Sequence, residues 1–252
     1  MRVETNERLV RRNRQIAQYL FFATFAILIG GLFIINQQVV SSEGDFAVVA
    51  LLQALILPIA FISTIVSVRM TNLWVRDPRP EKLIAAGLKG VSNRSVLYSY
   101  FHFPARHVLV CPQGVFAFVT RFQDGRFAVE NDQWRTRRTA IGRIVGLLRF
   151  DGLGNPTQDA QRAADHVKKL LEPIAPGIEV HPVIVFNDPR VSVEVISSSV
   201  EVRVAEYDQK GGKKVVVLPL KGLIKDFGTG ARGSDVLTTD QIAAFEAATL
   251  RR

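Results

Sequence analysis

The chain has 252 residues, a single cysteine and a net charge of +9, from 32 basic and 23 acidic residues. One cysteine, Cys111, excludes an internal disulfide and a cysteine-based metal cluster. A basic chain fits an anionic partner, either nucleic acid or a lipid surface, although a merely solvated basic surface has the same composition.

Two apolar stretches near the N-terminus predict a membrane anchor over residues 1–76. Residues 17–35 and 46–68 carry no charge, and a helix needs about 20 apolar residues to span a bilayer. A cleaved signal peptide is the alternative for the first stretch, but it would be shorter and would not be followed directly by a second span. We therefore expect an α-helical transmembrane hairpin with the lipid bilayer as its partner.

The basic residues that flank the two spans predict their orientation. Arginines precede the first span, and Arg69, Arg76, Arg79 and Lys82 follow the second, whereas the connecting turn has no basic residue. Basic flanks remain in the cytoplasm. We expect an integral membrane protein whose termini and globular domain, residues 77–252, are all cytoplasmic.

The globular domain begins after a stiff linker at residues 77–80. Residues 81–86 are expected to start a helix, and residues 92–103 are expected to form a second helix that Pro104 ends. A strand-rich segment follows, with strands predicted at residues 107–111, 114–120 and 126–130. The turns are Cys111-Pro112-Gln113-Gly114, which suits a type I turn, and Asp124-Gly125, which is a hairpin signal.

A helix and a buried strand follow the strand-rich segment. Asn155 is expected to cap the helix with Pro156 at its first position, and alanines and leucines recur along one face. The apolar run at residues 178–186 predicts a strand that returns to the same sheet. The sequence therefore predicts an α/β fold, with a mixed β-sheet flanked by helices.

The last part of the chain predicts smaller elements. Thr238 and Gln241 form a possible capping box for a final helix with Ile242, Phe245 and Ala248 facing inward. Residues 228–233 match G-x-G-x-x-G, but they follow no convincing strand, so we interpret them as a loop and expect no cofactor. The other expected elements are short strands at 191–196, 200–205 and 214–218, and a helical turn at 220–227.

The strand-rich segment resembles the nuclease-related domain (NERD) family. The family pattern is Asp-His opening a strand, then Gly-Val-Phe, then Glu-x-Lys on the next strand. The corresponding residues here are Arg106-His107, Gly114-Val115-Phe116 and Val119-Thr120-Arg121, and Trp134, Asn155-Pro156 and Gln161 also match. The resemblance covers roughly residues 85–190, implies a restriction-endonuclease-like core, and lacks the family's early Gly-Glu pair.

Three positions of the implied active site are degenerate: Arg106, Val119 and Arg121. A metal-dependent nuclease needs two carboxylates near one Mg²⁺ and a lysine beside the attacking water. An arginine repels the cation, a valine has no donor atom, and Arg121 is too basic to exchange protons. The substitutions therefore argue against cleavage and against a bound metal.

An anion-binding remnant is the first functional interpretation of this pattern, because guanidinium groups match phosphate oxygens. His107 is more typical of a structural histidine, since a base needs a partner within hydrogen-bond reach. The candidate anion-binding residues are Arg106, His107, Arg121, Arg135, Arg137, Arg138 and Gln161.

Two further interpretations remain open. The domain could be a structural module that makes protein contacts at the membrane. It could also be an active nuclease in which other acids have taken over the catalytic role, and the candidates are Asp124, Glu130, Asp132 and Asp159. The first interpretation, a membrane-anchored and catalytically degenerate domain that binds nucleic acid, is the one we carry forward.

Overall fold

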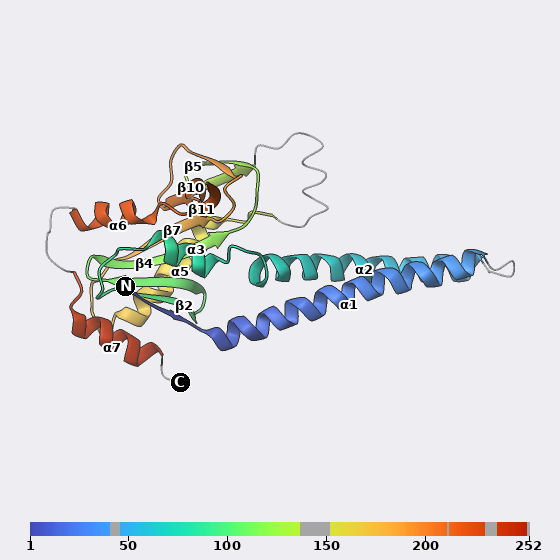
Figure 1. Ribbon diagram of the computed structural model, residues 1–252, viewed down its shortest axis with the longest axis horizontal. Coiled ribbons are helices and arrows are strands. Elements are labelled where there is room, and N and C mark those ends of the chain that lie inside the picture. Colours follow the sequence, from blue (N-terminus) through green and yellow to red (C-terminus); the bar gives the residue numbers. More distant parts are fainter. Residues whose placement is uncertain (41–45, 137–151, 211, 230–235, 251–252) are drawn as a thin grey trace. The chain divides into compact units, whose positions relative to one another are not determined.

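The computed structural model describes residues 1–40, 46–136, 152–210, 212–229 and 236–250. The chain forms two compact units (Figure 1). One unit is residues 8–77, and the other joins residues 1–7 to residues 78–252. The first few residues therefore belong to the same unit as the C-terminal part of the chain.

Two antiparallel helices make up most of the first unit (Figure 1). They are α1 (Glu7–Val40) and α2 (Phe46–Trp74). Small residues line their contact. Thr24 Oγ1 lies 2.6 Å from Ser63 Oγ, and a Cβ atom added at Gly31 would lie 2.6 Å from Cγ2 of Ile56. Small side chains at such a contact let two helix backbones approach closely.

Both helices are long and apolar enough to cross a membrane. The candidate spans are Glu7–Gln37, with 31 residues, and Ala47–Trp74, with 28 residues. Only 11% and 6% of their most apolar windows are buried, whereas the core helix of a globular protein is mostly buried. The two expected apolar helices are thus present, and they extend beyond residues 17–35 and 46–68.

A six-stranded mixed sheet forms the centre of the second unit, in the order β1-β2-β3-β4-β7-β9. Neighbours among β2, β3 and β4 are antiparallel, β1 is parallel to β2, and β7 is parallel to both β4 and β9. The expected mixed sheet and the return of the chain to it at β7 are confirmed. The strands are β1 (Arg2–Thr5), β2 (Val96–His102), β3 (Ala105–Cys111), β4 (Gly114–Arg121), β7 (Val180–Phe186) and β9 (Glu201–Val204).

Helices cover both faces of this sheet. The helices α5 (Pro156–Leu171) and α7 (Thr239–Thr249) pack on one face, and α3 (Pro80–Gly87) and α6 (Leu220–Thr229) pack on the other. Side chains alternate across a strand, so Val108 and Ala117 join the α5 face while Leu109 and Phe116 join the α3 face. The central strands are consequently buried on both sides.

The strand β1 was not anticipated from the sequence, where these residues form part of a basic flank. The backbone N–H of Arg2 donates to Ser95 O at 2.9 Å, and that of Asn6 donates to Ser99 O at 3.0 Å. The Arg2 guanidinium also pairs with Glu246 of α7. The chain therefore enters α1 directly from a strand of the globular unit.

The helix expected at residues 92–103 is wrong, because most of this segment is the strand β2. Every residue of β2 except Phe101 is buried, since the strand lies between β1 and β3 with helices over both faces. A strand buried on both faces has no alternation of polar and apolar residues. A short apolar run of this kind is compatible with a buried helix as well as with a buried strand. Tyr100 has a φ of 68° at an irregularity in the β2–β3 register.

The hairpin expected at Asp124-Gly125 is also wrong, although its two strands exist. The strand β5 (Arg126–Glu130) belongs to a separate sheet of order β6-β5-β8, with β6 at Gln133–Thr136 and β8 at Ser192–Val195. Both edges of β4 are already occupied, by β3 and β7. Gly125, with a φ of 124°, instead accepts a hydrogen bond from Ser192 N and leads the chain into β5, which pairs with β8.

The C-terminal elements agree in part with the sequence. The Thr238–Gln241 capping box is present, and Ile242 and Phe245 are buried, but Ala248 is exposed. A two-stranded sheet of β10 (Glu206–Lys210) and β11 (Lys213–Val217) contains one strand that was not predicted. Residues 137–150 and most of the 228–233 motif lie outside the described residues.

Candidate functional site

The three degenerate positions lie on one face of the central sheet. The antiparallel register pairs His107 with Phe118, so continuing it places Arg106 beside Val119. Val119 packs against the clusters that contain α5 residues, and Arg121 follows two residues later on the same face. The expectation that Val119 and Arg121 share a face is confirmed.

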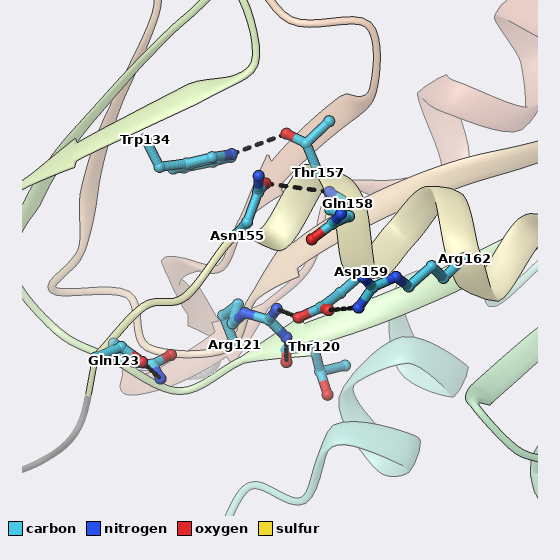
Figure 2. Close-up of polar contacts among 10 residues, drawn as sticks. Thr120, Arg121, Gln123, Trp134, Asn155, Thr157, Gln158, Asp159 and Arg162 are labelled. Atoms are coloured by element: carbon cyan, nitrogen blue, oxygen red, sulfur yellow. Dashed lines mark hydrogen bonds and ion pairs between the residues drawn. The ribbon is translucent and has the colours of Figure 1, made fainter.

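An ion pair between Arg121 and Asp159 connects this face to α5. Asp159 lies in the first turn of α5, and the guanidinium donates to its carboxylate. Arg121 Nη1 also donates to Thr120 O at 3.2 Å. Arg162, one turn further along α5, approaches the same carboxylate at 4.0 Å, so two guanidinium groups share one acid (Figure 2).

The pair is half-buried, and this sets its electrostatics. The Arg121 side chain is 14% exposed, whereas Asp159 is 47% exposed. Burial lowers the pKa of the Arg121 guanidinium, while the neighbouring Asp159 acts in the opposite direction. Arg106 lies close enough to lower the pKa of Arg121 further. Arginine nevertheless stays charged in proteins, so the site is cationic.

The start of α5 is held by neighbouring polar contacts, which position Asp159. Asn155 Oδ1 accepts a hydrogen bond from Gln158 N at 3.1 Å, which confirms the predicted cap with Pro156 at the first helical position. Trp134 Nε1 donates to the hydroxyl of Thr157 at 2.8 Å (Figure 2). The strand β6 and the helix α5 therefore meet beside the ion pair.

The four acids that could have replaced the missing carboxylates are held in separate places. Asp159 pairs with Arg121, and Asp124 lies 3.6 Å from Arg190. Glu130 lies 3.7 Å from Arg135, and Asp132 accepts a hydrogen bond from Ser199 N at 2.8 Å. Among the described residues, no group of three His, Cys, Asp or Glu side chains could hold a metal ion.

His107 lies on the opposite face of the sheet from Arg106. It is fully buried, its Nδ1 lies 3.1 Å from Ser99 Oγ, and its ring packs edge-on against Tyr100. Burial lowers the pKa of His107 to about 3, with a smaller contribution from Arg106. His107 is thus neutral and enclosed, and it does not join the arginines on the α5 face.

The remaining candidate anion-binding residues are dispersed. Arg135 on β6 is exposed and pairs with Glu130. Gln161 Nε2 donates to Ser199 Oγ at 3.1 Å, so its side chain is engaged with the loop before β9. Arg137 and Arg138 lie outside the described residues. Of the predicted set, the structure brings together only Arg106 and Arg121 within its described part.

One residue at this site was missed in the sequence, and one buried acid was missed on the opposite face of the sheet. Arg162 has a simple signal, its position three residues after Asp159 on a helix. Glu81, in the first turn of α3, is buried, accepts a hydrogen bond from the Tyr100 hydroxyl at 3.0 Å and lies 3.1 Å from Arg79. Its signal was an acid directly after Pro80 at a helix start.

The comparison with family models bears directly on this site. Residues 79–187 match the model described as nuclease-related domain (NERD), which confirms the resemblance and its extent. Neither the curated proteins nor the solved structures contain a match to the chain. The matched segment includes α3, the strands β2 to β7 and α5, and therefore every residue of the ion-paired site.

Proposed function

The chain carries a nuclease-related domain at residues 79–187, and from this premise we propose that the domain binds nucleic acid at a membrane without cutting it. Such a domain would hold the phosphate backbone by its charge and leave the phosphodiester bond intact. The proposal has three parts, which are the loss of cleavage, the binding of phosphate and the membrane anchor.

The Arg121–Asp159 ion pair is the observation that carries the loss of cleavage. Metal-dependent hydrolysis requires carboxylates that are available to a cation and a group that can take a proton from water. Arg106 and Val119 stand where the resemblance implies carboxylates, and the nearby acid, Asp159, is paired with Arg121. A divalent cation at this position would face guanidinium groups, and their charge repels it.

The excess of arginine over acid supports the binding of phosphate. Arg121 and Arg162 share a single carboxylate, that of Asp159, and Arg106 lies close enough to Arg121 to lower its pKa; Arg162 is 64% exposed. The whole chain carries +9. Guanidinium groups form paired hydrogen bonds with phosphate oxygens, and phosphate contacts supply most of the sequence-independent affinity for nucleic acids.

The connection of the strands supports the membrane anchor. Residues before α1 and after α2 form one sheet, because β1 pairs with β2. Both ends of the hairpin must then lie on the same side of a bilayer, which two consecutive spans provide. The sequence between the two apolar stretches, residues 36–45, has no basic residue, whereas arginines lie beyond both spans, so both termini and the domain face the cytoplasm.

A binding and cleavage assay with the full-length chain in zwitterionic lipid nanodiscs tests the proposal. Labelled duplex and single-stranded DNA are incubated with and without Mg²⁺ or Mn²⁺ and separated on a gel. We expect shifted but intact DNA, with an affinity that falls steeply as salt rises. The variant R121Q/R162Q should bind about fivefold more weakly or worse, on the scale of two lost phosphate contacts.

The control variant K168Q/K169Q removes the same charge from exposed positions on the same helix. It should bind nearly as well as the unmodified chain. Cut DNA whose appearance depends on Asp159 would show instead that the acid has become catalytic. Intact DNA that stays unbound at low salt would favour a domain that makes protein contacts.

A further inference from the structure

Arginines are concentrated at one end of the helical hairpin that α1 and α2 form. Four of these arginines lie in the first two turns of α1, and two lie near the end of α2 or just beyond it. All six are exposed, and within residues 8–40 and 46–77 the only acid is Asp77. The basic end, as we call this set, consists of Arg8, Arg11, Arg12, Arg14, Arg69 and Arg76.

The antiparallel register brings these arginines to similar depths along the hairpin. The contacts of Thr24 with Ser63 and of Gly31 with Ile56 define the register. Continuing it places Arg76 at the level of Arg11. Arg69 then lies at the level of Gln18, next to the first apolar residues of α1. The basic end is therefore a property of both helices together.

The depth of the basic end matches the headgroup layer of a bilayer. At about 1.5 Å per residue, Arg14 lies about 4.5 Å before the apolar stretch that begins at Ala17, and Arg8 lies about 13 Å before it. The polar layer on each side of a bilayer is about 5–8 Å thick, from a hydrocarbon core of about 30 Å within a total of 40–45 Å. The guanidinium groups span this layer and its outer boundary.

Five of the six arginines of the basic end are available for an external anion. Among the described residues, Arg8, Arg11, Arg12, Arg14 and Arg69 have no carboxylate partner. All six basic residues are arginines, and none is a lysine. The planar guanidinium binds phosphate through paired hydrogen bonds, whereas an ammonium acts as a point charge.

We propose that the basic end binds the headgroup phosphates of anionic phospholipids in the leaflet that it enters. The inference rests on the membrane insertion that forms part of the proposed function. A phosphate in an anionic lipid keeps its net charge, whereas choline neutralises it in a zwitterionic lipid. Basic residues next to a membrane span attract anionic lipids by about 1 kcal/mol each, or about fivefold in association per charge.

Spin-labelled lipids test this proposal on the full-length chain in vesicles. Electron spin resonance gives the association constant of spin-labelled phosphatidylglycerol relative to phosphatidylcholine at the protein surface. We expect the unmodified chain to prefer phosphatidylglycerol by about fivefold at low salt. The variant R8Q/R11Q/R12Q should lose most of that preference, and it retains Arg14, Arg69 and Arg76 to maintain orientation.

The control variant R126Q/K168Q/K169Q removes three exposed charges from the globular unit and should retain the lipid preference. Equal affinity of the unmodified chain for the two lipids would overturn the proposal. Loss of the preference when duplex DNA is added, together with loss of DNA binding in R8Q/R11Q/R12Q, would also overturn it by assigning the surface to nucleic acid.

Alkaline extraction separates this proposal from the one on which it rests. A chain that resists extraction with carbonate at high pH is inserted, so a missing lipid preference then counts against the basic end alone. A chain that is extracted is not inserted, and both the anchor and the lipid site are then wrong. DNA binding by the globular unit is measured independently in zwitterionic nanodiscs.

Discussion

Arg121, the last residue of β4, and Asp159, in the first turn of α5, form an ion pair between positions 38 residues apart in the chain. The carboxylate neutralises part of the charge that would otherwise meet a phosphate. A nuclease of the expected type would place an acid and a lysine here to activate water. In this chain the same face holds an arginine and its counter-ion.

Replacing Asp159 with Asn should strengthen DNA binding. The change removes one negative charge beside Arg121 and Arg162 while it keeps the shape of the side chain. A charge about 4 Å away is worth about 1 kcal/mol in a medium close to bulk water. We expect the affinity for duplex DNA at low salt to rise about threefold to tenfold, measured by fluorescence anisotropy. The matched control is Asp165→Asn, on the same helix and exposed. Equal effects of the two variants would mean that Asp159 does not restrain the site.

Removing the cap of α5 should destabilise the globular unit. Asn155→Ala deletes the acceptor for Gln158 N, and losing such a cap costs about 1 kcal/mol, within a range of about 0.5–2 kcal/mol. Asn155→Asp keeps the acceptor and should be nearly neutral. The free energy of unfolding can be followed with urea through Trp134 fluorescence in a Trp74→Phe background. A loss of similar size in both variants would contradict the capping role.

Motifs within a few residues of chain predicted the start of α5, but they did not predict the residues that α5 contacts. Asn155, Pro156 and the capping box at Thr238 were recognisable because each motif lies within four residues of chain. The pairing of Arg121 with Asp159 depends on how β4 and α5 are brought together, and no local pattern encodes a contact of that range.

The misassigned strands have a similar explanation. The run that became β2 is buried on both faces, so its polarity does not distinguish helix from strand. The strand β5 left the central sheet because β7 occupies the edge of β4, and β7 lies some fifty residues further along the chain. Strand order of this kind follows from competition between distant segments, which a single sequence does not show.

Acid should destabilise the globular unit through His102. This ring is buried between Tyr98 and Phe245, and within the described part of the chain neither ring nitrogen has a hydrogen-bond partner. Burial lowers the pKa of His102 to about 4, with a smaller contribution from His166. An unfolded chain with a pKa near 6.5 binds the proton first, so stability is intact above about pH 6.5 and falls as the pH drops towards 4.

The loss from His102 should be on the order of 3 kcal/mol, because each unit of pKa difference is worth about 1.4 kcal/mol. His107 has a pKa lowered to about 3 and contributes in the same direction. The variant His102→Phe should therefore flatten the pH dependence of unfolding between pH 6.5 and 4 without abolishing it. Urea titrations at several pH values measure this slope. A variant with the slope of the unmodified chain would show that His102 is not the responsible group.

Two adjacent glycines of α1 should respond oppositely to the same substitution. A Cβ atom at Gly31 would lie 2.6 Å from Cγ2 of Ile56, a branch that cannot swing away without moving α2. Gly31→Ala should destabilise the helix pair by about 1–3 kcal/mol. A Cβ atom at Gly30 meets nothing within 4 Å, so Gly30→Ala should be neutral or stabilising by up to about 1 kcal/mol, as alanine favours the helix. Thermal unfolding of the full-length chain in detergent compares the two, and a G31A protein as stable as G30A would rule out the close approach of α1 and α2 at this point.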